Sequence, residues 1–160
     1  MRTLLVASLL AASTASTALA APGSGPEQDV VNTVQRLFDA MAARDTAGIL
    51  AVLTPEARVV SVRPNQTTSQ ISGTDFATRI AASQDALLER MWQPQVLVAG
   101  RMATLWAPYD FHIGTRLSHC GVDSVTLFAT PAGWKIAGIY YTVVEAAQCA
   151  PSPLGPPEFK

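Results

Sequence analysis

Hydrophobic residues recur with a helical period in the first part of the chain. After Asp29 they return every three or four residues, as expected for a helix with one apolar face: Val30, Val31, Val34, Leu37, Phe38 and Met41. A second, short helix is predicted over Thr46 to Leu53, and Pro55 ends it. A third is predicted to begin at Gly73-Thr74-Asp75, with an apolar face formed by Phe76, Ile80 and Leu87. Helices are therefore expected to dominate the first half of the chain.

Short apolar segments bounded by turn residues predict strands. The segment RVVSVR, Arg58 to Arg63, is one, and the turn at Pro64-Asn65 lets Thr67 to Ile71 return beside it. After Glu89 the pattern predicts strands joined by tight turns: Met91 to Val98, Met102 to Ile113, Arg116 to Thr130 and Trp134 to Val144. Helices followed by a long antiparallel meander indicate an α+β domain, with the helices packed on one face of a curved antiparallel β-sheet. Such a cone leaves a pocket at its open end.

Both ends of the chain are predicted to lie outside this domain. Residues 1–20 resemble a signal peptide, with Arg2, an apolar stretch and an A-x-A cleavage site at Ala18-Leu19-Ala20. We therefore expect export to the periplasm or the medium, with Ala21 as the first mature residue. A flexible lead-in is predicted over residues 21–28, the domain over 29–146, and a disordered Pro-rich tail over 147–160.

Composition and charge narrow the classes of partner. Eleven basic and 12 acidic residues give a formal charge of −1, and no basic cluster is present, so neither nucleic acid nor a membrane surface is expected as a partner.

In an exported chain the two cysteines, Cys120 and Cys149, are predicted to form a disulfide. The alternative is a small core residue at Cys120 and a free thiol at Cys149. The sequence carries no metal-binding or cofactor fingerprint, so neither a metal nor a cofactor is expected.

Two stretches carry a resemblance to a known superfamily. One is VQRLFDAMAARDTAGILAVLTPEARVV; the other is VLVAGRMATLWAPYDF followed by GVDSVTLFATPAGWKIAGI. Their order of elements resembles the nuclear transport factor 2-like superfamily, which includes SnoaL-like polyketide cyclases and ketosteroid isomerases. The resemblance implies the cone fold and an exported branch of that superfamily. It does not imply one activity, because the fold carries enzymes, transport factors and assembly domains.

The register of one hairpin predicts a candidate site. If Gly114-Thr115 is a two-residue loop, Asp110 lies opposite His119, and the same face also carries Trp106 and Asp123. A slip of one residue would move His119 to the other face. The neighbouring hairpins add Met91 and one tyrosine, either Tyr140 or Tyr141, depending on the loop after Thr130.

Three functions are compatible with this constellation. The first is an exported binding domain, in which Met91, Trp106, Tyr109 and Tyr140 contact a small molecule and Asp110, His119 and Asp123 orient it. The second is a cofactor-free isomerase, dehydratase or cyclase, in which the Asp–His pair is a general base and the tyrosine donates to an oxyanion. The third is a structural domain that forms a homodimer through its sheet, with the charged residues solvated and Trp106 against the partner.

Overall fold

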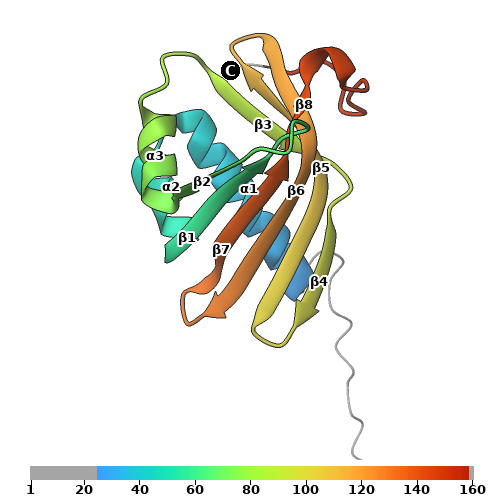
Figure 1. The fold of residues 1–160 in the computed structure, drawn as a ribbon. Helices are drawn as coiled ribbons and strands as arrows, with labels where there is room; N and C mark the ends of the chain where they lie inside the picture. Colours follow the sequence, from blue (N-terminus) through green and yellow to red (C-terminus); the bar gives the residue numbers. More distant parts are fainter. Residues whose placement is uncertain (1–24, 159–160) are drawn as a thin grey trace, which may run out of the picture.

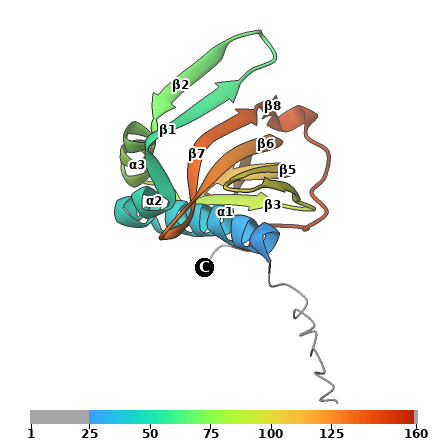
Figure 2. The same cartoon turned by 90° about the horizontal axis from the view of Figure 1, so that it is seen from below.

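The computed structural model describes residues 25–158 as three helices on one side of a curved sheet (Figures 1 and 2). The expected signal peptide lies outside these residues. The helices are α1 (Pro26–Ala43), α2 (Thr46–Val52) and α3 (Gly73–Ala81), with a short 3₁₀-helix, η1, at Ala146–Gln148. The strands are β1 (Leu53–Val62), β2 (Thr68–Ser72), β3 (Leu87–Met91), β4 (Gln95–Ala99), β5 (Met102–Ile113), β6 (Arg116–Thr130), β7 (Gly133–Thr142) and β8 (Val144–Glu145). The α+β cone predicted from the sequence is confirmed.

All eight strands belong to one sheet in the order β2-β1-β7-β6-β5-β3, with β4 beside β5 and β8 beside β6. The pairs are antiparallel except β1 with β7, which is parallel. Figure 2 shows the strands curving around an interior that α1 closes along one side. The core lies there, because α1 turns Val30, Val34 and Leu37 toward the sheet. No helix among residues 25–158 is long and apolar enough to cross a membrane.

The single strand that the sequence predicts over Met91 to Val98 is replaced in the structure by two strands, β3 and β4. The third helix ends at Ala81, so Leu87 belongs to β3 and not to that helix. β3 and β4 pair with opposite halves of β5, and residues 92–94 between them change the direction of the chain. Gln93 has a positive φ of 48°, and Pro94 has no backbone N–H to continue a ladder.

The β5–β6 register differs from the predicted one beyond its turn. Ile113 lies opposite Arg116 and His112 opposite Leu117, as a two-residue loop requires. Phe111 then lies opposite His119, so Ser118 is an extra residue on β6. This is a β-bulge, which shifts every later pair by one residue. Asp110 consequently lies opposite Cys120, and the expected pairing of Asp110 with His119 is wrong.

Candidate functional site

A cavity of about 240 Å³ lies between the concave face of the sheet and helices α1 and α3. Most of its lining is aliphatic or aromatic: Leu37, Phe38, Met41, Val59, Ile71, Phe76, Ile80, Phe111 and Ile139. Its polar lining is Arg79, Glu89, Tyr109, His119, Asp123 and Tyr141. An apolar cavity with a few converging polar groups is the usual form of a small-molecule site.

Two acidic side chains meet inside this cavity. Glu89 comes from β3 and Asp123 from β6, and a side-chain hydrogen bond joins them. Two carboxylates cannot form such a bond unless one is protonated. The Oδ2 atom of Asp123 is buried and accepts no hydrogen bond from a backbone, hydroxyl or cationic donor among the described residues, so the carboxyl group of Glu89 is the partner that remains for it. The acid pair is therefore the main polar feature of a mostly apolar cavity.

Burial raises the pKa of both acids. For Glu89 the pKa is well above its ordinary value, first because of burial, then because of the charge and hydrogen bond of Asp123. Burial raises the pKa of Asp123 to about 7, while the hydrogen bond from Glu89 acts the other way. Two acids this close titrate as a unit, so the pair retains a proton near neutral pH.

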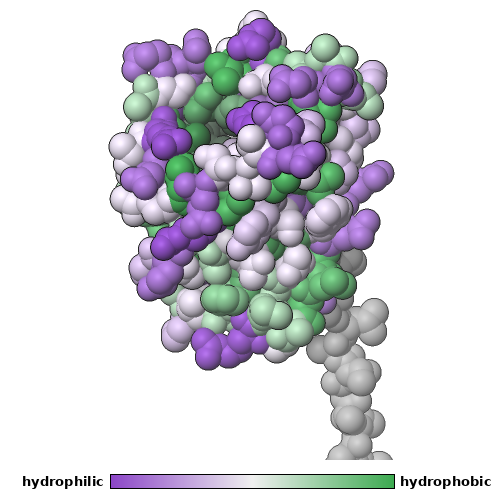
Figure 3. All heavy atoms as spheres, in the orientation of Figure 1, coloured by the Kyte–Doolittle hydropathy of each residue, from purple (hydrophilic) through white to green (hydrophobic). Residues whose placement is uncertain are grey.

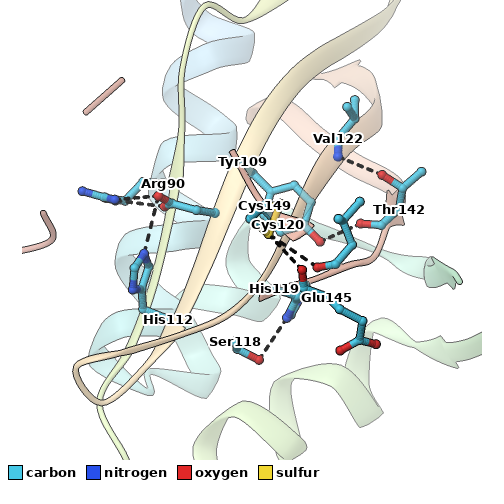
Figure 4. The surroundings of a disulfide bond; sticks show 12 residues. Arg90, Tyr109, His112, Ser118, His119, Cys120, Val122, Thr142, Glu145 and Cys149 are labelled. Atoms are coloured by element: carbon cyan, nitrogen blue, oxygen red, sulfur yellow. Dashed lines mark hydrogen bonds and ion pairs between the residues drawn. A yellow bond between two sulfur atoms is a disulfide. The ribbon is translucent and has the colours of Figure 1, made fainter. Parts of the chain in front are cut away.

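Aromatic side chains surround the carboxyl pair. The hydroxyl of Tyr109 donates to the carbonyl of Thr142 at 2.8 Å (Figure 4). Burial and the nearby acids raise the pKa of Tyr109 above its ordinary range. Tyr141 lies opposite Asp123 on β7, and burial raises its pKa as well. Both phenols therefore stay protonated and act as hydrogen-bond donors at neutral pH.

His119 lies on the concave face among these rings. Its imidazole makes an edge contact with Tyr109 at 5.7 Å between ring centroids and stacks on Tyr141 at 6.2 Å. Burial lowers the pKa of His119 and the charge of Arg63 lowers it further, whereas Glu145 raises it. The imidazole is therefore uncharged at neutral pH, so it can accept a proton but does not carry a permanent positive charge.

Asp110 is on the opposite face of the sheet, 3% exposed, in a cluster of its own. The guanidinium of Arg90 donates to its two oxygens at 2.9 and 2.5 Å, and His112 lies 3.4 Å away (Figure 4). Burial alone would raise the pKa of Asp110, but the hydrogen bonds and charge of Arg90, then those of His112, hold it below its ordinary value. Asp110 is thus an ion-pair partner, and the structure does not bring it to His119.

The other predicted contact residues are divided between the two faces. Tyr109, His119 and Asp123 line the cavity, as expected. Trp106 and Tyr140 do not line it, and they are 50% and 46% exposed. Tyr141 takes the inner position because Ala137 is an extra residue on β7 between the pairs Leu127–Ile136 and Thr126–Gly138, and this bulge brings Tyr141 instead of Tyr140 opposite Asp123. Met91 packs against the core and lines a groove beside α1 instead of the cavity.

The sequence interpretation missed Glu89 because it placed Leu87 on a helix and began the next strand at Met91. The signal was present in the segment LLERM, where Leu87, Glu89 and Met91 alternate with residues of the other face. An acid at the middle position of a strand's inner face indicates a paired group or a cavity. Among the described residues, no group of three or more His, Cys, Asp or Glu side chains could hold a metal ion.

The predicted disulfide between Cys120 and Cys149 is present, with 6.0 Å between the Cα atoms. It attaches the C-terminal segment to β6, outside the cavity (Figure 4). The carbonyl of Gly155, farther along the same segment, accepts a hydrogen bond of 3.0 Å from Arg90. The segment therefore has two attachments to the sheet.

Comparison with family models and with curated protein sequences gives no match. Solved structures do match. A candidate dehydratase of the nuclear transport factor 2-like family from Streptomyces avermitilis is 19% identical, with a TM-score of 0.61 over 75% of this chain and 96% of that one. A nuclear transport factor 2-like protein with a cystatin-like fold from Novosphingobium aromaticivorans is 13% identical, with a TM-score of 0.61 over 76% and 83%. A superfamily protein from Salmonella enterica serovar Typhimurium is 14% identical, with a TM-score of 0.60 over 78% and 97%. The resemblance seen in the sequence is thus confirmed at the level of architecture, and the chain has the nuclear transport factor 2-like fold.

Proposed function

We propose that the cavity binds a small, mostly apolar organic molecule that donates a hydrogen bond to the Glu89–Asp123 pair. The observation that carries this proposal is the pair of hydrogen-bonded acids in a mostly apolar cavity. Two carboxyl groups that share one proton keep oxygen lone pairs that a ligand donor can use. The apolar lining would supply the remaining affinity.

Binding can be tested with N-phenylnaphthylamine, a neutral probe that fluoresces in apolar sites. We expect saturable binding to the wild-type protein and little binding to an Ile71→Trp variant, because Ile71 lines the cavity and a larger ring would fill it. The matched control is Trp106→Ser on the exposed face, which should bind normally. Equal binding by Ile71→Trp would place the probe outside the cavity and remove the proposal. Native mass spectrometry of protein purified from its own host would look for the natural ligand.

A second candidate function is cofactor-free acid–base catalysis on a carbonyl compound. The raised pKa values of Glu89 and Asp123 favour it, because near neutral pH one member of such a pair can accept a proton while the other donates one. Tyr141 is placed to donate to a developing oxyanion, and neutral His119 is a further acceptor. This assignment replaces the Asp110–His119 dyad expected from the sequence. The dehydratase label of the Streptomyces protein agrees with this class of reaction.

Hydrogen–deuterium exchange at the carbons beside the carbonyl of 2-indanone tests this chemistry, since exchange requires proton removal and return. We expect the protein to accelerate exchange, and Glu89→Gln and Asp123→Asn each to lower the rate by about a hundredfold. Glu56→Gln, at an exposed position of β1, is the charge-matched control. An exchange rate that is unchanged in both Glu89→Gln and Asp123→Asn would rule out catalysis by this pair and leave only the binding proposal.

Export remains part of the proposed function. The disulfide supports it, because disulfides persist in oxidising compartments. The intact mass of the protein recovered from the periplasm or medium should correspond to a chain beginning at Ala21. Retention of residues 1–20 would contradict the localisation.

We also propose a homodimer through the outer face of the sheet. Large apolar side chains are exposed there: Leu97, Met102, Trp106, Phe128 and Tyr140. Figure 3 shows hydrophobic surface over the lower parts of this face, with hydrophilic side chains around it. Such a patch on a small domain is typical of an interface. Light scattering should give a dimer for the wild type and a monomer for Trp106→Glu, with Thr67→Glu on the β1–β2 connection as the control.

The open cavity favours a binding or catalytic role over a purely structural one.

A further inference from the structure

One arginine lines the cavity, and a second is close enough for its charge to act on cavity residues. Arg79, on α3, lines the cavity directly. Arg63 follows β1, and on this strand Val59 and Ser61 turn inward, so the alternation directs Arg63 to the same side. The charge of Arg63 acts on Tyr109, His119 and Tyr141, which places its guanidinium near these cavity residues.

Neither guanidinium is neutralised by an ion pair within residues 25–158. Asp75 lies one helical turn before Arg79, but its carboxylate accepts a hydrogen bond from the Ser72 hydroxyl at 2.8 Å. Glu145, on β8, is an acid whose charge acts on His119. Because Glu89 and Asp123 share a proton, the cavity interior adds about one negative charge. The mouth therefore has two cationic side chains that are free to hold an anion.

We infer that the ligand is an amphipathic organic anion, with a carboxylate-type head held by Arg63 and Arg79 at the mouth and an apolar body inside the cavity. This inference rests on the proposed function, because it assumes that the cavity is the binding site. Arginine suits the role, since its planar guanidinium donates two parallel hydrogen bonds to a carboxylate or sulfonate. The apolar lining beyond the arginines accommodates the body of such a molecule.

A pair of probes isolates the head group. Anilinonaphthalene sulfonate is N-phenylnaphthylamine with one added sulfonate, so the ratio of their dissociation constants reports on the anion alone. We expect the wild-type protein to bind the anionic probe more tightly. Arg63→Gln and Arg79→Gln should each reduce that preference by about fivefold, because each removes a partly exposed charge contact. Both arginines are exposed, so neither variant endangers the fold.

Two controls test the sign and the place of the effect. Arg36→Gln removes the same charge from the outward side of α1, where Arg36 donates to Thr33, and should leave the ratio unchanged. Glu145→Gln should increase the preference for the anionic probe, because it removes a negative charge near the mouth. Added salt should weaken binding of the anionic probe only.

The outcomes separate the inference from the proposal beneath it. If the neutral probe binds in the cavity but the ratio is the same in the wild type, Arg63→Gln and Arg79→Gln, the anion inference is wrong and the binding proposal stands. If Ile71→Trp binds the neutral probe as well as the wild type does, the binding proposal fails and the inference fails with it. A loss of preference in both arginine variants, with Arg36→Gln unchanged, supports both.

Discussion

The carboxyl groups of Glu89 and Asp123 form a hydrogen bond although strand β5 lies between the two strands that carry them. The contact exists because both side chains point to the concave face, where the curvature of the sheet brings nonadjacent strands together. An acid pair in an apolar enclosure must hold a proton, and that requirement makes its behaviour depend on pH.

We expect the stability of the protein to fall as the pH rises from about 5 to 8. Burial raises the pKa of Asp123 to about 7, and the pKa of Glu89 is raised also, so the folded state holds protons that the unfolded chain releases above about pH 4. The stabilisation is complete below the unfolded pKa and is lost as the pH rises through the folded one. The loss should be on the order of 2 kcal/mol.

Thermal unfolding across this pH range measures the effect. Glu89→Gln should show a weaker pH dependence than the wild type, because only one acid is left to ionise, and Glu89→Gln combined with Asp123→Asn should show the least. Glu56→Gln, on the solvent side of β1, should behave as the wild type. A wild-type melting temperature that stays level or rises from pH 5 to pH 8 would contradict the shared proton.

The pKa of His119 should respond to Arg63 and not to Asp110. Burial and then the charge of Arg63 lower this pKa, so Arg63→Gln should raise the midpoint measured by NMR titration. Asp110→Asn should leave it unchanged, because Asp110 points to the opposite face of the sheet. A marked shift in Asp110→Asn would mean that the bulge at Ser118 is absent in solution.

Breaking the pair between Arg90 and Asp110 should destabilise the fold. Asp110 is buried and accepts two hydrogen bonds from Arg90, so Arg90→Gln leaves a buried carboxylate without its cation. The expected loss is about 3 kcal/mol in denaturant unfolding. Arg101→Gln, which removes only hydrogen bonds to the carbonyl of Ala129, should cost much less. Equal losses in the two variants would show that the ion pair has no special role.

Reduction of the Cys120–Cys149 disulfide should destabilise the protein by about 3 kcal/mol, because the bond closes a loop between residues 29 positions apart and restricts the unfolded chain. It should also expose the segment after Cys149 to proteases, because among residues 25–158 the Arg90–Gly155 hydrogen bond and the packing of Pro153 and Leu154 would then be left to hold it. Denaturant unfolding of Cys149→Ser and limited proteolysis measure the two effects. Two reactive thiols in the denatured, unreduced protein would show that the bond does not form.

Local patterns in the sequence were sufficient for much of the architecture. The helical period after Asp29 and the alternating segments after residue 90 predicted helices on a curved sheet, because burial of one face imposes these periods. The turn at Gly114-Thr115 was also correct, with a positive φ of 58° at Gly114, a conformation that glycine tolerates readily. Cysteine count and context were enough to predict the disulfide.

The membership of the site was decided by tertiary structure. Asp110 lies on the outer face because its β5 neighbours Tyr109 and Phe111 point inward, and one extra residue at Ser118 on β6 separates His119 from that outer face. The sequence by itself determined most of the strand segments, with β3 as the exception, because strand formation reflects a repeating pattern of burial. Only the packed sheet decided which side chains share a face, because a single inserted residue inverts that assignment for the rest of the strand.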